Sequence, residues 1–150
     1  MNELIARSDR TPGEYMDYRK QEVQLDVVWR FLLAWNSSDL SGVRELFAAD
    51  AIIEGTLARG SLKEVLPVWR DLAVAFRPQR TVESMVAQDG EVVALYTEQG
   101  VFVGPLRCRL PTGRRYELVT MDWFAFEGEK IRRLGRLMDY GDQARQIKMR

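Results

Sequence analysis

Residues 114–140, RRYELVTMDWFAFEGEKIRRLGRLMDY, decide the fold, because two segments of two-residue period flank a turn-like run, EGEK, at 127–130. Alternate residues of a strand point to opposite sides of a sheet. The two sets of the first segment are Leu118, Thr120, Asp122, Phe124 and Phe126 on one side, and Val119, Met121, Trp123 and Ala125 on the other. Both sets are largely apolar, so the pattern predicts a hairpin that is covered on both faces, on one of them by helices of its own chain.

Two charged residues, Asp122 and Arg136, stand among the apolar residues of this hairpin. A three-residue loop over 128–130 would place them directly opposite each other, on the inner face of the sheet. The same loop length pairs Phe124 with Leu134 and Thr120 with Met138. We therefore expect a cross-strand ion pair. Such a pair either neutralises itself inside an apolar cavity or is retained, at a desolvation cost of roughly several kcal/mol per charge, to meet a ligand.

The composition is that of one soluble domain with an ordinary core. The chain has 150 residues, of which 46% are hydrophobic and 29% charged, and its 22 Lys and Arg residues balance 22 Asp and Glu residues. No net basic field is available to attract nucleic acid or a membrane surface. Four arginines cluster around one turn, and we interpret them as a solvated loop rim. They are Arg107, Arg109, Arg114 and Arg115.

Missing residue types exclude several chemistries. The chain contains no histidine, which excludes Ser-His-Asp and Cys-His catalysis and the usual zinc sites that contain histidine. No nucleotide-binding or calcium-binding motif occurs, so we expect neither a cofactor nor a metal.

The single cysteine, Cys108, fits a reducing compartment and is interpreted as a structural thiol. No apolar run is long enough for a membrane span, and the first ten residues are too charged for a signal peptide, so we expect a cytoplasmic protein.

Helical periodicity dominates the first half of the chain. We expect a helix over 14–36, a short helix capped by Asp39, and a third helix that begins with a capping box at 61–64. A short strand over 51–54 separates the second helix from the third. After Pro78 the period changes to two, which predicts strands over 81–87 and 91–103 around the turn Asp89-Gly90.

These elements follow one another in the order α-α-β-α-β-β-β-β, which is typical of an α+β domain. We expect a single domain over 14–140, built as a strongly curved antiparallel sheet on which three helices pack. A flexible arm over 1–13 would precede it. The polar tail over 141–150 is expected to be either a short helix or disordered.

Several short motifs, in this order and spacing, resemble the SnoaL-like polyketide cyclases, and together they cover roughly residues 25–140. They are FLLAWNSSDL at 31–40, LFAADA at 46–51, LPTGR at 110–114 and DWFAF at 122–126, followed by Gly128, Lys130 and Ile131. The family also holds ketosteroid isomerase and limonene epoxide hydrolase, within the superfamily named for nuclear transport factor two. The resemblance implies a cone-shaped curved sheet wrapped by helices, an apolar pocket and a dimer.

The catalytic residues of these relatives do not carry over. The resemblance puts the base of the isomerase at Gly55 and its tyrosine at Phe31, and only its hydrogen-bonding acid has a match, at Asp122. The Arg and two Asp residues of the epoxide hydrolase would fall on Gln99, Val101 and Arg136. The cyclase itself would have its histidine at Asp122 and its base at Arg136. The scaffold is kept while each catalytic set is broken, and a fold alone does not carry function.

Asp122 and Arg136 are our candidate catalytic residues. A neighbouring guanidinium lowers the pKa of a carboxyl group, so Asp122 would act as a base while Arg136 holds a developing enolate or alkoxide. Strand parity is interpreted as placing Thr97 and Gln99 on the inner face, and Tyr96, Glu98 and Glu54 on the outer face. The candidate ligand-binding residues are Phe31, Ile53, Trp69, Thr97, Gln99, Val101, Thr120, Phe124, Leu134 and Met138.

These features favour a cofactor-independent cyclase, isomerase or epoxide-opening enzyme that acts on a small apolar cyclic or polyketide-like molecule. The alternative is an accessory protein that binds such a molecule without catalysis. The outward row Val119, Met121 and Trp123 is too apolar to leave wet, so we also expect a homodimer through the outer sheet face.

Overall fold

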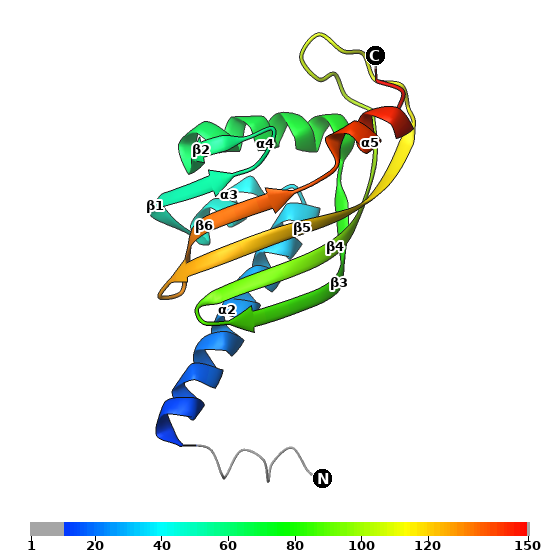
Figure 1. Cartoon of the computed structure of the whole chain (residues 1–150). Coiled ribbons are helices and arrows are strands. Elements are labelled where there is room, and N and C mark those ends of the chain that lie inside the picture. The colour runs from blue at the N-terminus through cyan, green and yellow to red at the C-terminus, as the bar shows by residue number, and fades with distance from the viewer. Residues whose placement is uncertain (1–10, 150) are drawn as a thin grey trace.

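A computed structural model describes residues 11–149 as a curved, unclosed sheet with helices on its concave side (Figure 1). The elements are α2 (Pro12–Asn36), α3 (Leu40–Glu45), β1 (Phe47–Glu54), β2 (Arg59–Ser61), α4 (Leu62–Phe76), β3 (Gln79–Gln88), β4 (Glu91–Val101), β5 (Arg115–Glu127), β6 (Lys130–Leu137) and α5 (Tyr140–Gln146). The strand order is β2-β1-β6-β5-β4-β3. This is the predicted α+β cone, with one parallel pair, β1 and β6, in an otherwise antiparallel sheet.

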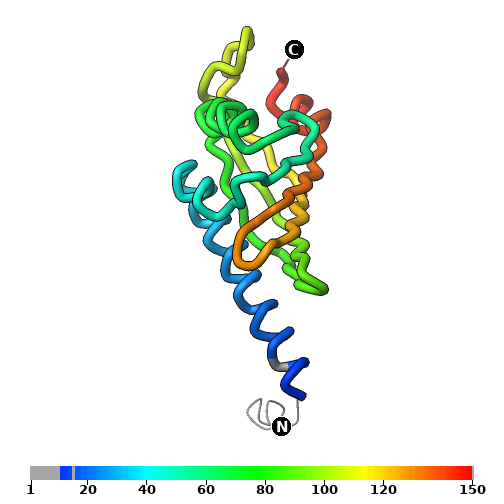
Figure 2. Tube along the Cα trace, turned by 90° about the vertical axis from the view of Figure 1, so that its left-hand side faces the viewer, coloured from blue at the N-terminus to red at the C-terminus, as the bar shows by residue number. Residues whose placement is uncertain are grey.

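The core lies between the inner face of the sheet and the helices α2 and α4. Phe31 and Trp35 of α2 pack with Trp69 of α4 and with Phe124 and Leu134 of the sheet. The N-terminal half of α2 projects beyond the sheet (Figure 2). A second, smaller cluster forms where α5 closes the opposite end; its members are Ala75, Phe76, Phe102, Tyr116, Leu118 and Ile147. Among residues 11–149, no helix is both long and apolar enough to cross a membrane.

The two ends of the chain differ from the sequence prediction. A capping box at Thr11 and Glu14 starts α2, with Pro12 as its first residue, so 11–13 belong to the helix and its cap rather than to a loose arm. The rest of the predicted arm, residues 1–10, lies outside the described residues. Of the two alternatives expected for the tail, the structure shows the helix, α5, and its C-cap residue Ile147 is fully buried.

The register of the central hairpin is confirmed, although the predicted loop is wrong. Asp122 pairs with Arg136 and Phe124 with Leu134. The loop, however, has two residues, because Glu127 pairs with Lys130, and Gly128 adopts the left-handed conformation that such turns need. A bulge between the pairs Ala125–Arg133 and Phe126–Ile131 adds one residue to β6 and restores the register.

The predicted parity of β4 is wrong. Ala94 pairs with Asp122 and Tyr96 with Thr120, and cross-strand partners share a face, so Tyr96 and Glu98 point inward. Thr97, Gln99 and Val101 therefore belong to the outer set. Thr97 donates a hydrogen bond to Glu83 (2.7 Å), and Gln99 donates one to Glu117. The outward position predicted for Glu54 is confirmed, since its carboxylate pairs with Arg133 at 2.7 Å.

The capping box of α4 gives a stability prediction. The Ser61 hydroxyl accepts a bond from the Glu64 amide, and the Glu64 carboxylate accepts one from the Ser61 amide (2.8 Å). Ser61→Ala is expected to lower the free energy of unfolding by about 1 kcal/mol, measured by urea denaturation. Thr11→Ala removes the same cap from α2, where the first turns are exposed, and should cost clearly less. Equal losses would show that the projecting end of α2 unfolds together with the domain.

Candidate functional site

Four buried charged side chains form one connected network, which we call the charge tetrad: Arg80 (β3), Glu98 (β4), Asp122 (β5) and Arg136 (β6). Arg136 donates to both oxygens of Asp122, from Nε to Oδ1 (2.8 Å) and from Nη2 to Oδ2 (2.9 Å). Arg80 links the two acids, donating from Nη1 to Asp122 Oδ2 (2.8 Å) and from Nε to Glu98 Oε2 (2.6 Å). The expected pair of Asp122 and Arg136 is therefore half of a network with two charges of each sign.

The tetrad continues into a tyrosine on the neighbouring strand. The Tyr116 hydroxyl donates to Glu98 Oε1 (2.9 Å), and the buried Gln143 side chain of α5 lies close to the same tyrosine. Gly100 lies directly across the ladder from Tyr116, and a Cβ at that position would stand 2.5 Å from the tyrosine ring. Glycine therefore leaves the space in which Tyr116 reaches Glu98. This contact ties α5 to the charged centre of the cone.

Aromatic rings enclose the two guanidinium groups. The Trp35 ring lies 4.8 Å from Arg80 Cζ and 4.5 Å from Arg136 Cζ, while Tyr96 faces Arg80 at 5.2 Å and Trp69 faces Arg136 at 5.3 Å. Electron-rich ring faces stabilise cations that have lost their water. Within residues 11–149, three buried polar atoms here have no hydrogen-bond partner: Trp35 Nε1, Tyr96 Oη and Thr120 Oγ1.

The surroundings set the protonation states of the site. Burial alone would raise the pKa of Asp122, but the charges and hydrogen bonds of Arg136 and Arg80 outweigh it and lower that pKa below its ordinary value. Burial likewise opposes the charge of Arg80, yet Glu98 and Asp122 raise its pKa. Burial raises the pKa of Tyr116 and of Tyr140. Asp122 is therefore ionised at neutral pH, while the tyrosines remain hydrogen-bond donors.

Two hollows lie at the α5 end of the cone and share four lining residues: Leu72, Phe76, Tyr140 and Gln143. The inner one, of about 20 Å³, is lined by three members of the tetrad, Arg80, Glu98 and Arg136, but not by Asp122. The outer one is an apolar groove of about 550 Å³ between α4, α5 and the loop that joins β4 to β5. Tyr140 and Gln143 therefore separate a ligand-sized groove from the charges.

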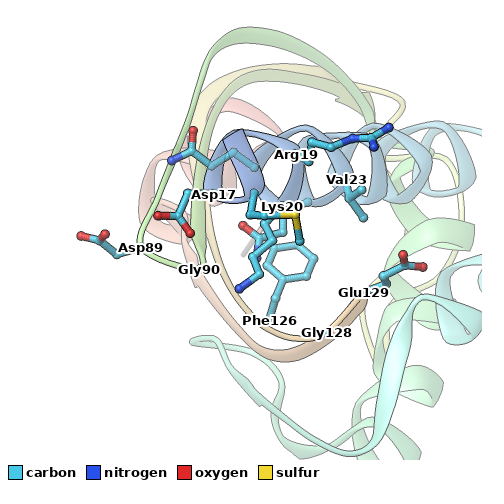
Figure 3. A pocket seen from close by; sticks show the side chains of 12 residues that line it. Asp17, Arg19, Lys20, Val23, Asp89, Gly90, Phe126, Gly128 and Glu129 are labelled. Atoms are coloured by element: carbon cyan, nitrogen blue, oxygen red, sulfur yellow. The ribbon is translucent and has the colours of Figure 1, made fainter. Parts of the chain in front are cut away.

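A third hollow, of about 650 Å³, lies far from the tetrad in the fold. Figure 3 shows it between α2 and the turns of two hairpins, near Asp89-Gly90 and Gly128-Glu129. Its lining mixes both charges with Met16, Val23 and Phe126, and it contains none of the candidate site residues. Its volume alone does not make it the site.

The candidate ligand-binding residues divide into three groups. Phe31, Ile53, Trp69, Phe124 and Leu134 are packed in the core and line neither hollow at the α5 end. Thr97, Gln99 and Val101 belong to the outer set of β4. Thr120 is buried beside the tetrad, and Met138 alone of the ten lines the inner hollow.

The structure adds residues that the sequence analysis missed or misread. Glu98 was assigned to the wrong face, and Arg80, Tyr116, Tyr140 and Gln143 were not assigned to the site. Cys108 is exposed and lines the groove, so its interpretation as a structural thiol is wrong. The part of the chain that the structure covers holds no group of three acidic, cysteine or histidine side chains suited to a metal ion.

An unclosed α+β cone with its polar groups buried at one end defines the class of fold, and the sequence then gives the family. The chain belongs to the SnoaL-like domain family, whose model matches residues 28–134. No curated protein sequence matches the chain.

Solved structures agree with this assignment. The chain is similar to AclR from Streptomyces galilaeus, a proposed hydroxylase, at 19% identity and a TM-score of 0.78, covering 85% of this chain and 97% of that one. It is similar to IdmH from Streptomyces antibioticus, a proposed polyketide cyclase, at 22% identity and a TM-score of 0.74, covering 83% and 98%. A proposed SnoaL-like polyketide cyclase from Jannaschia sp. CCS1 matches at 16% identity and a TM-score of 0.78, covering 93% and 96%. Because the sequence identities are low and the TM-scores high, these similarities establish the fold alone.

Proposed function

We propose that this protein is a cofactor-independent enzyme of the cyclase type, acting on a small apolar cyclic or polyketide-like molecule. The observation that carries the proposal is the inner hollow, where the Glu98 carboxylate and the Arg136 guanidinium face the same space behind an apolar groove. Family membership supports the same class of activity. A carboxylate and a cation placed together are what proton transfer with enolate formation requires.

The geometry favours Glu98 over Asp122 as the base. Asp122 accepts three bonds from two arginines and does not line the hollow, so its role is to position Arg136. Glu98 accepts one bond on each oxygen, which leaves about two of its four acceptor sites for a substrate.

In the proposed cyclisation, Glu98 takes a proton from a carbon between two carbonyl groups, and Arg136 stabilises the enolate. The enolate carbon then attacks a further carbonyl of the same molecule, and the resulting alkoxide takes back the proton from Glu98. Enolate-mediated isomerisation would use the same two groups, and in epoxide opening Arg136 would stabilise the alkoxide.

The inner hollow holds little more than a water molecule. A ring-sized substrate therefore occupies the groove, and only its reacting edge passes Tyr140 and Gln143.

Purified protein should convert an open-chain β-polyketone attached to an aromatic ring into a product of equal mass or one lighter by water. No cofactor is added, and a chelator is present. Mass spectrometry of the reaction mixture checks this. Binding without conversion would contradict the enzymatic proposal.

That contrary result would favour a second function, an accessory protein that binds such a molecule without catalysis. The observation in its favour is the pairing of the tetrad, in which the two acids and two arginines already hydrogen-bond with one another. A self-neutralised network of this kind can serve stability alone.

Both proposals include a cytoplasmic location, because a chain with a single cysteine fits a reducing compartment.

A homodimer through the outer sheet face also remains a proposal. Val119 and Leu137 are 67% and 68% exposed there, beside the half-buried Met121 and Trp123. Apolar groups gathered in this way are typical of an interface. We expect light scattering to give a dimer at micromolar concentration, and Val119→Glu to give a folded monomer. Val74→Glu, at an exposed apolar position on α4, is the matched control and should leave the dimer intact. A monomeric wild-type protein would contradict the proposal.

A further inference from the structure

We infer that the substrate carries an anionic group, such as a carboxylate, which Arg107 and Arg109 hold at the rim of the groove while its apolar body lies against α4 and α5. This inference rests on the proposed function, because it names the class of molecule that the same site takes. Both arginines line the groove and are exposed, and neither has an ion pair within residues 11–149.

The walls of the groove explain the apolar part of the ligand. Leu57, Val68, Leu72, Phe76, Leu106 and Met149 form most of its surface. Its volume of about 550 Å³ suits a molecule of a few fused rings. Besides Asp71 on α4 and Cys108, the polar residues of the lining are Tyr140 and Gln143 on α5 and the two arginines on the loop that joins β4 to β5. A molecule lying in the groove would thus have one end near the tetrad and the other near the arginines.

The loop presents the arginines on an ordered turn. Leu106 and Arg109 form a bridge closed by two backbone hydrogen bonds (3.1 and 3.0 Å), with Arg107 in the left-handed conformation at φ 53°. The base of the loop is fixed as well, since Val103 and Gly104 donate to the Ala75 carbonyl of α4 (2.9 and 3.1 Å). A Cβ on Gly104 would lie 2.6 Å from the Val74 carbonyl oxygen, so only glycine allows this approach. Figure 1 shows the loop rising beside α5 and the C-terminal end.

The charge of the groove favours an anion. Its ionisable lining besides Cys108 and Tyr140 consists of Arg107, Arg109 and Asp71, so positive charge exceeds negative by one at neutral pH. Asp71 lies on α4 and would repel an anion weakly. Exposed ion pairs contribute little individually. The two arginines together should favour an acid over its uncharged ester by about five- to tenfold at low salt.

The test compares two fluorescent probes, anthracene-2-carboxylate and its methyl ester, by titration into the full-length protein. The wild type should bind the acid about five- to tenfold more tightly than the ester at low salt, and the preference should fall at high salt. Arg107→Asn with Arg109→Gln should remove the preference and leave ester binding unchanged. Asparagine suits the left-handed position, so this variant should fold normally. Arg114→Gln is the matched control, because Arg114 is exposed on the same loop but does not line the groove, and it should keep the preference.

Equal binding of the two probes by the wild type, binding of neither, or a preference that survives the double variant would overturn the inference. Asp71→Asn should strengthen binding of the acid about two- to threefold, and no change or a loss would count against it. The outcomes separate the two proposals. A preference for the acid without turnover of any substrate overturns only the catalytic proposal, whereas turnover with no preference overturns only this inference.

Discussion

Asp122→Asn is expected to lower the free energy of unfolding by about 3–5 kcal/mol at neutral pH, because it leaves two buried guanidinium groups facing one remaining carboxylate. Asparagine keeps the size and one acceptor oxygen, so the loss reports charge rather than packing. Urea unfolding measures it. Asp26→Asn, in an exposed i,i+4 pair with Arg30, is the matched control and should cost well under about 1 kcal/mol.

The stability difference between the wild type and Asp122→Asn should depend on pH. The folded-state pKa of Asp122 lies below its unfolded value of about 4, so the stabilisation is complete above that pH and is lost as the pH falls towards the folded pKa. Below about pH 4 the stability difference between wild type and Asp122→Asn should shrink by about 1.4 kcal/mol per pH unit. Other carboxyl groups titrate in both proteins and largely cancel. A difference that stays constant down to pH 3 would contradict the ionised state of Asp122.

Paired substitutions test how the tetrad is connected. Asp122→Leu with Arg136→Met leaves Arg80 and Glu98 as an intact pair at 2.6 Å and should recover most of the stability lost in Asp122→Leu alone. Asp122→Leu with Arg80→Met removes the same charges but leaves Glu98 without its arginine partner, so it should recover less. Equal recovery would show that only the net charge of the interior matters.

The second large effect concerns catalysis, and it depends on the proposed function. Glu98→Gln should lower kcat by about 10²- to 10⁴-fold, because glutamine cannot accept the substrate proton. The amide oxygen can still accept a bond from Arg80, but the lost charge should lower the free energy of unfolding much as in Asp122→Asn. The two kcat values are therefore compared at a temperature at which circular dichroism shows both proteins to be folded. Glu117→Gln makes the same change at an exposed residue on β5 and should leave kcat unaltered. Glu98→Gln with wild-type kcat would exclude Glu98 as the base.

The accuracy of the sequence predictions depended on how local each feature was. Asp122 and Arg136 belong to one hairpin, and the bulge at β6 compensated for the wrong loop length. On β4, Val92 and Ala94 face inward, but Val93 and Leu95 are also apolar, so alternation did not distinguish the two faces. The wrong choice reversed Thr97, Glu98 and Gln99 together.

The rest of the site depended on contacts between distant residues. Arg80 reaches Asp122 across 42 positions of sequence, and it follows Pro78 closely, where the pattern changes from helix to strand. The groove requires α4, α5 and a loop that meet only in the folded chain. No periodic pattern encodes such a meeting.

The balanced charges of the tetrad also bear on how this protein can change through evolution. Losing any one of Arg80, Glu98, Asp122 or Arg136 leaves an unmatched buried charge, so a lineage that drops one of them passes through a poorly folded ancestor unless a neighbour changes as well. Arg80 and Glu98, or Asp122 and Arg136, are therefore expected to be inherited or lost in pairs of opposite sign. Descendants that carry only three of the four should have gained a compensating charge within reach of the gap.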